Sequence, residues 1–144
     1  MPSCYFLTVC NGSSVDQQSN NVTLFNLVEQ INVPPGAPPP PKGLIPLEIH
    51  SYWSLSASET TQDFEVRYIL VAETGIETSS EVYRHRCKTH RYRTRCLGLP
   101  MPPVPGTYEL RVEWRGIPED PWSREQSVWP VIIAEVEPKP KITH

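Results

Sequence analysis

The chain has 144 residues, 38% of them hydrophobic, and a formal net charge of −3. This length suits one domain with one core, and the composition is that of a globular protein. Apolar runs stay far below the roughly 20 residues of a membrane-spanning helix, so we expect no membrane association. The first residues contain neither a basic stretch nor a long apolar run, which argues against a secretory signal and favours a cytoplasmic location.

Short segments of alternating polarity, separated by proline and glycine, predict an all-β protein. Seventeen prolines gather mainly at 34–41 and 100–105, and proline cannot donate to a sheet ladder. No segment keeps a 3.6-residue period, so no helix is expected. The pattern predicts strands at 4–10, 22–33, 44–55, 64–72, 76–87, 89–97, 106–114 and 127–136. Their spacing is typical of an immunoglobulin-like antiparallel β-sandwich of about seven to nine strands.

One sandwich domain is predicted over 1–137, followed by a flexible tail at 138–144. The Pro-rich stretch 34–43 is interpreted as a stiff crossover between the two sheets, with polyproline II geometry at 34–41. A ligand for a proline-binding groove is the less favoured alternative.

In the predicted 22–33 strand, which precedes the Pro-rich stretch, apolar residues fall on both sides. This pattern indicates either burial on both faces or a bulge near Asn26.

A tyrosine that directly follows a turn marks the start of the 106–114 strand. Pro105, Gly106 and Thr107 lead into Tyr108. This arrangement is typical of a tyrosine corner, in which the ring enters the core and the hydroxyl bonds back to the backbone. An ordinary core tyrosine is the alternative. Alternation places Tyr108, Leu110, Val112 and Trp114 inward and turns Glu109, Arg111 and Glu113 towards water.

Several short motifs occur along the chain: the opening Ser3-Cys4-Tyr5, the strand that runs from Asn21 to Glu29, Leu97-Gly98-Leu99-Pro100-Met101-Pro102, and Pro105-Gly106-Thr107-Tyr108 with the strand after it. Together they resemble the pattern of a bacterial family of small single-domain proteins known only as a domain of unknown function. The resemblance implies a β-sandwich of bacterial or phage origin, and it supplies no activity and no catalytic residues. The chain departs from the family pattern in its long Pro-rich insert and in the basic strand before Leu97.

The sharpest charge feature is a basic segment at 84–95 that contains no acidic residue. Its six cationic side chains are Arg84, Arg86, Lys88, Arg91, Arg93 and Arg95. The remaining chain has 7 basic and 16 acidic residues, so positive charge is concentrated in this segment of an otherwise acidic chain, which points to a specific role for it. Strand periodicity places the first three on one face and the last three on one face of the next strand. A turn near Lys88 and Thr89 would join the two rows into one basic ridge.

Three interpretations of the basic segment remain open. Its side chains form cross-strand pairs with acids such as Glu65, Glu77, Glu109 and Glu113, or they bind an acidic protein partner, or they bind the nucleic-acid backbone. Trp122, in a loop rich in proline, is a candidate interface anchor. The alternative for Trp122 is a side chain folded back over the end of the sandwich.

No enzyme, metal or cofactor signature stands out. The chain has no nucleophile elbow, phosphate-binding loop or zinc-protease motif, and its few aspartates and histidines are scattered. A zinc site would use Cys87, His90 and Cys96 but lacks a fourth ligand at suitable spacing. Buried free thiols are therefore expected.

We therefore expect a non-enzymatic module that binds another protein or a second copy of itself, with no small-molecule substrate. The alternative function is a nucleic-acid-binding domain that uses the strand pair 84–95.

Overall fold

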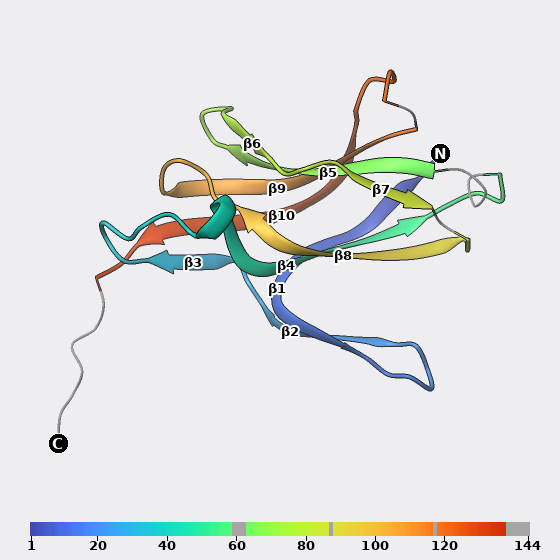
Figure 1. Cartoon of the computed structure of the whole chain (residues 1–144), viewed down its shortest axis with the longest axis horizontal. Coiled ribbons are helices and arrows are strands. Elements are labelled where there is room, and N and C mark those ends of the chain that lie inside the picture. The colour runs from blue at the N-terminus through green and yellow to red at the C-terminus, as the bar shows by residue number, and fades with distance from the viewer. Residues whose placement is uncertain (59–62, 87, 117, 138–144) are drawn as a thin grey trace.

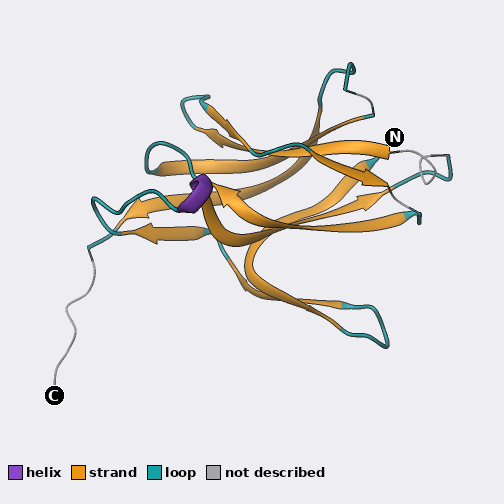
Figure 2. Ribbon diagram, viewed as in Figure 1, coloured by secondary structure: helices purple, strands orange, loops and turns teal. Residues whose placement is uncertain are grey.

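The computed structural model describes residues 1–58, 63–86, 88–116 and 118–137, and almost all regular structure in them is β (Figures 1 and 2). The strands are β1 (Ser3–Val15), β2 (Val22–Leu27), β3 (Gln30–Val33), β4 (Leu44–Ser54), β5 (Asp63–Ala72), β6 (Glu77–Ser79), β7 (Tyr83–Arg86), β8 (Arg91–Pro100), β9 (Gly106–Arg115) and β10 (Ser123–Glu135). One 3₁₀ turn, η1 (Pro41–Gly43), precedes β4. Within the described residues, no helix is long and apolar enough to cross a membrane.

The strands form two sheets packed face to face, which confirms the predicted sandwich (Figure 1). Sheet A has the order β2-β1-β4-β8, and sheet B has the order β3-β10-β9-β5-β6, with β7 also paired to β5. The neighbours β4 and β8 in one sheet and β5, β9 and β10 in the other match the B–E and C–F–G neighbours of immunoglobulin-like sandwiches. One core cluster lies between the sheets, with Trp53, Ile49, Leu70, Leu99 and Leu110 fully buried.

The predicted 22–33 strand is two strands that belong to different sheets. Asn26 adopts a left-handed φ of 53°, and the chain leaves sheet A after Leu27 and joins sheet B at Gln30. Burial on both faces was wrong, since Phe25 and Leu27 are 49% and 52% exposed. The change of sheet brings β3 beside β10 in parallel register, so the sandwich is not purely antiparallel. The 76–87 segment is likewise split, into β6 and β7, which gives ten strands in the described residues rather than seven to nine.

The Pro-rich segment connects sheet B to sheet A, since β3 precedes it and β4 follows it. It is not one continuous polyproline helix. A turn closes where the Ala37 amide donates to the Pro34 carbonyl at 3.1 Å, and η1 closes the other end. Pro40 between them keeps polyproline dihedrals, φ −64° and ψ 155°.

A cluster of buried hydroxyl groups interrupts the apolar core between β4, β5 and β8. The Ser51 hydroxyl lies 2.8 Å from that of Tyr68 and 2.5 Å from that of Thr94, and the last two are 2.9 Å apart. The Trp53 indole donates to Ser51 Oγ at 2.9 Å. These contacts satisfy four buried polar side chains and tie the two sheets together, because Tyr68 belongs to sheet B and the others to sheet A.

The tyrosine corner is present. Tyr108 is 3% exposed, and its hydroxyl donates to the carbonyl oxygen of Val104 at the entrance to β9. Leu110 and Val112 are buried as predicted, whereas Trp114 is only partly buried. Glu113 does not face water, because arginines cover it and leave it 6% exposed.

We expect Tyr108→Phe to lower the free energy of unfolding by about 1–2 kcal/mol, because the mutation leaves the ring in the core and the Val104 carbonyl without its donor. Urea unfolding of both proteins measures the change. Tyr5→Phe is the control, since Tyr5 is 50% exposed and its change should stay within about 0.5 kcal/mol. A Tyr108→Phe protein as stable as the wild type would contradict the role of the corner.

Candidate binding site on sheet A

The six basic residues of 84–95 do not form one ridge, because β7 lies in sheet B and β8 in sheet A. On both strands, the side chains between successive arginines point into the space between the two sheets. The His85 ring lies 5.5 Å from that of Tyr92, centroid to centroid, and both face the interior. The arginines of β7 and β8 therefore lie on opposite outer faces of the sandwich. The expected shared face was wrong because the chain changes sheets between β7 and β8 instead of forming a hairpin.

Three of the six cations are neutralised by carboxylates. The ion pairs are Arg84–Glu65 at 3.5 Å, Arg86–Asp63 at 2.6 Å and Arg95–Glu48 at 2.7 Å. Arg84 and Arg86 stand directly opposite their partners in the β5–β7 register, as cross-strand pairing requires. Glu65 was among the predicted partners of the segment, and Asp63 and Glu48 were not. The pairing interpretation therefore accounts for half of the segment.

The other three cations, Lys88, Arg91 and Arg93, form no ion pair within the described part of the chain. Arg93 donates to the side-chain oxygen of Asn20 at 3.1 Å, and Lys88 and Arg91 are exposed. Arg91 and Arg93 line one wall of a pocket of about 580 Å³, which we call the hairpin pocket. Its other lining residues are Tyr5, Tyr52, Ser19, Asn20, Asn21 and Val22. No acidic side chain lines it.

The β1–β2 hairpin forms the roof of this pocket. In Figure 1 the hairpin bends away from the sandwich and extends beside the outer side of sheet A. Its tip contacts β8 through the Asn20–Arg93 hydrogen bond, and Asn20 reaches this position with a left-handed φ of 59°. Ser13 anchors the hairpin further back, with its hydroxyl 2.8 Å from Glu48. The pocket thus exists because the hairpin is held over the sheet at two points.

Two tyrosines form the floor of the hairpin pocket. The pairing of β1 with β4 shifts register between Cys4 and Phe6, so Tyr5 is an extra residue that a β-bulge turns outward. Its ring lies edge-on to Tyr52 at 6.1 Å. Burial raises the pKa of Tyr52, and the nearby Arg93 guanidinium opposes this effect. The floor is therefore an aromatic surface beside two guanidinium groups.

Trp122 packs onto the outer face of sheet B. Its ring lies between two guanidinium groups, with Arg67 Cζ 4.3 Å and Arg115 Cζ 4.2 Å from the centroid. These arginines also bond the buried carboxylates of Glu113 and Glu65, both at 2.7 Å. The charges on this face are therefore largely paired within the chain, and Trp122 is partly buried over them.

Trp122→Ala is expected to lower stability by about 1–2 kcal/mol, since two cation–π contacts of about 0.5–1 kcal/mol each are lost. Chemical denaturation followed by circular dichroism measures this change. Trp122→Phe is the matched control and should retain most of the stability, because a phenyl ring still stacks against both arginines. A stability unchanged by the alanine mutation would show that the ring is not held by Arg67 and Arg115.

A second polar cluster lies beneath the hairpin on the outer side of sheet A. Glu48 accepts hydrogen bonds from Ser13 and from Arg95, and its Oε1 lies 2.9 Å from His50 Nε2. The Arg95 hydrogen bond lowers the pKa of Glu48 most, to about 2, although burial opposes it. Cys10, opposite Glu48 in the β1–β4 register, is fully buried, and burial raises its pKa.

The zinc arrangement considered from the sequence does not assemble in the described residues. Cys87 lies outside them, Cys96 packs in the core between the sheets, and His90 is an exposed residue whose Nδ1 lies 3.3 Å from the Leu55 carbonyl oxygen. Cys4, Cys10 and Cys96 are buried and form no disulfide within the described residues.

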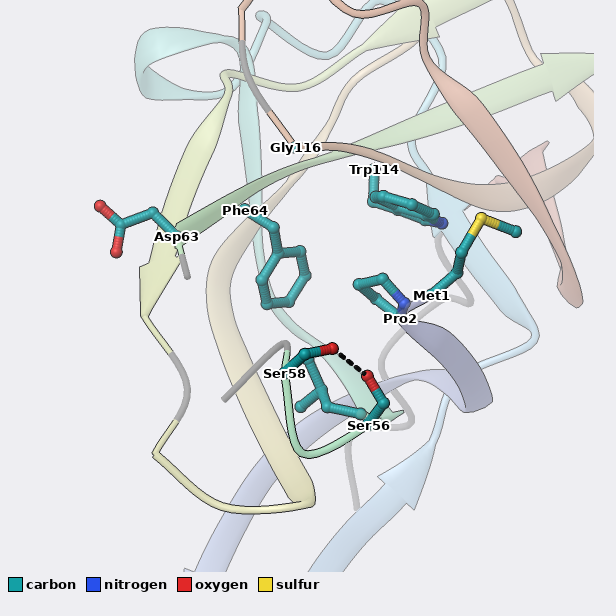
Figure 3. Close-up of a pocket in the computed structure, with 9 residues that line it drawn as sticks. Met1, Pro2, Ser56, Ser58, Asp63, Phe64, Trp114 and Gly116 are labelled. Carbon is teal, nitrogen blue, oxygen red and sulfur yellow. Dashed lines mark hydrogen bonds between the residues drawn. The ribbon is translucent and has the colours of Figure 1, made fainter. Parts of the chain in front are cut away.

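A smaller hollow of about 280 Å³ lies at one end of the sandwich, beside the first residues of the chain (Figure 3). Its walls are mainly Pro2, Phe64 and Trp114, and its rim carries Ser56 and Ser58, whose hydroxyls are 3.1 Å apart. The Asp63 carboxylate points away from the hollow and pairs with Arg86 (Figure 3). The described residues that line the hollow are mostly apolar or carry hydroxyl groups, and Asp63 is the one carboxylate among them.

Compared with known proteins, the chain matches no family model, and no curated protein is significantly similar to it.

Proposed function

We propose that the chain is a non-enzymatic β-sandwich binding module whose partner is an acidic, extended segment of another protein, seated in the hairpin pocket and along β8. The observation that supports this function most directly is that only three of the six basic residues of 84–95 form ion pairs with carboxylates in the described residues. The three without a carboxylate cluster at one end of β8, and two of them face the aromatic floor of the hairpin pocket.

Charge and geometry at this site suit an acidic peptide. Arginine presents a planar fork of donors that matches a carboxylate, and Arg91 and Arg93 stand on the same face of one strand. Tyr5 and Tyr52 add apolar area with polar tips, a composition that is common at interfaces. Asn20, Asn21 and Ser19 supply further hydrogen-bonding groups at the rim of the pocket.

The edge position of β8 supports an extended partner. Among the strands of the described residues, β8 pairs with β4 alone, so its other edge can present backbone groups to a further strand. A segment added there would run beside Arg91, Arg93 and the exposed Leu97. The resemblance to a bacterial family would place such a module in a bacterial or phage assembly.

A nucleic-acid partner is less well supported. Affinity for a duplex or a single strand rises with the number of phosphates neutralised. The three cations of 84–95 that lack an ion pair within the described residues would neutralise few, and the chain has a net charge of −3. The paired arginines on sheet B are not available without breaking their ion pairs.

Fluorescence anisotropy with a short labelled poly-glutamate peptide at low salt tests the proposal. Two double variants remove the same charge, Arg91→Gln/Arg93→Gln at the pocket and Arg84→Gln/Arg86→Gln on sheet B. We expect the first to weaken binding about tenfold or more, since each lost charge-assisted hydrogen bond costs on the order of 1 kcal/mol. The second should leave affinity within about twofold.

The outcomes discriminate the partners. Equal weakening in both double variants, or no peptide binding by the wild type, would overturn the proposed site. Tighter binding of labelled single-stranded or duplex oligonucleotides than of the peptide, lost in the pocket variant, would replace the protein partner by a nucleic acid.

A further inference from the structure

The cluster beneath the hairpin contains a set of side chains suited to a metal ion. Cys10 Sγ, a Glu48 carboxylate oxygen and a ring nitrogen of His50 lie within 4.8 Å of one another. Thiolate, imidazole and carboxylate are the three ligand types that zinc uses in proteins. All three residues are buried, at 0%, 6% and 4% exposure, so they are held in place by the fold rather than gathered on a mobile surface.

The spacing is close to that of a zinc site. Zinc–ligand bonds of about 2.0–2.3 Å place two ligands of a tetrahedral ion roughly 3.3–3.7 Å apart. The 2.9 Å contact between Glu48 and His50 is slightly shorter than such a pair, and no pair exceeds 4.8 Å. Side-chain adjustments of about 1 Å would therefore complete the geometry, with no change in the register of β1 and β4.

A second, independent feature, an unpartnered buried hydroxyl group, also points to a bound ligand at this cluster. The Thr8 hydroxyl is the buried side-chain oxygen that finds no hydrogen-bond partner in the described residues. Thr8 is two residues before Cys10, on the same face of β1, and stands opposite His50 in the register. A buried polar group without a partner costs free energy, and a water molecule on a bound ion would give this hydroxyl a partner.

The surroundings also suit a divalent cation. The thiolate and the carboxylate together balance the charge of Zn²⁺. Arg95 binds the other oxygen of Glu48 at 2.7 Å, and it would hold this carboxylate in position from outside the coordination sphere. Because the ligands come from β1 and β4, directly under the hairpin, an ion here would fasten the base of the hairpin to the sheet.

We propose that Cys10, Glu48 and His50 bind a Zn²⁺ ion, with a water molecule as the fourth ligand. The site is separate from the hairpin pocket and does not depend on the partner proposed above.

Metal titration of the full chain, purified under reducing conditions and freed of metal, tests the site. Co²⁺ serves as the spectroscopic probe and Zn²⁺ as the competitor. The wild type should bind one equivalent of Co²⁺ with a thiolate-to-metal charge-transfer band in the near ultraviolet, and Zn²⁺ should abolish the band. At a free Zn²⁺ concentration a hundredfold above Kd, Tm should rise by roughly 5–10 °C.

Cys10→Ser should lose both the charge-transfer band and the Tm shift, while Cys96→Ser, which changes a buried thiol in the core, should keep them. His50→Gln is the second ligand variant. If Cys10→Ser fails to fold, the same charge-transfer band and Tm shift are measured on His50→Gln, and both should be lost. A wild type without the band or the Tm shift would overturn the site. A band that persists in Cys10→Ser, or that disappears only in Cys96→Ser, would also overturn it.

Discussion

Ser51→Ala is expected to lower the free energy of unfolding by about 2–4 kcal/mol, a large effect for the loss of one oxygen atom. The Ser51 hydroxyl contacts three buried groups, the hydroxyls of Tyr68 and Thr94 and the indole N–H of Trp53. In the alanine protein the indole N–H remains buried without an acceptor, and unsatisfied buried groups cost about 1–3 kcal/mol each. Urea unfolding followed by tryptophan fluorescence measures the loss.

Ser54→Ala is the control for this prediction. Ser54 ends the same strand but is exposed, so its substitution should change stability by less than about 0.5 kcal/mol. A Ser51→Ala protein destabilised by no more than this control would show that the hydroxyl cluster does not stabilise the core.

Alkaline pH is expected to destabilise the protein through Tyr68. Burial raises the pKa of this tyrosine from 10.0 to about 12, although its hydrogen bonds with Ser51 and Thr94 act in the opposite direction. Between these two values the folded state holds a proton that the unfolded state has lost, so stability falls as the pH rises. The full stabilisation is present below about pH 10, and about 1.4 kcal/mol should be lost by about pH 11.

The measurement compares urea unfolding near neutral pH with unfolding at about pH 11 for the wild type and Tyr68→Phe. Phenylalanine has no proton to lose, so the variant should lose about 1.4 kcal/mol less stability over this interval than the wild type does. Other tyrosines with raised pKa values, among them Tyr52 and Tyr108, contribute to both proteins and cancel in the comparison. Equal losses in the two proteins would contradict the assignment to Tyr68.

Most of the fold could be predicted from the sequence, because it follows from local patterns. Strict alternation at 64–72 and 106–114 and the turn before Tyr108 are short-range signals, and the structure confirms the strands and the corner. The changes of sheet at Asn26 and between β7 and β8 depend on long-range pairing. Alternation reports which residues share a strand face but not which sheet receives the strand.

The same limit explains what the sequence missed at the candidate sites. The basic segment was visible as charge, but its division into paired and unpaired cations depends on Asp63, Glu65 and Glu48, which are distant in sequence from 84–95. Tyr5 enters the hairpin pocket only because a bulge turns it outward. The Cys10–Glu48–His50 cluster arises from the register of β1 and β4, and the spacing of these residues in the sequence carries no motif.

The placement of β10 also governs how the protein forms during synthesis. β10 leaves the ribosome after the other strands, yet it supplies the partner for both β9 and β3. Its Glu125 side chain binds the Cys4 amide at 2.6 Å, and its Ser127 hydroxyl binds the Cys4 carbonyl at 2.8 Å. Until β10 emerges, β9 carries an open edge and β3 has no partner strand, which favours wrong associations. The sandwich therefore completes its strand pairing late, only after nearly the whole described chain has been translated.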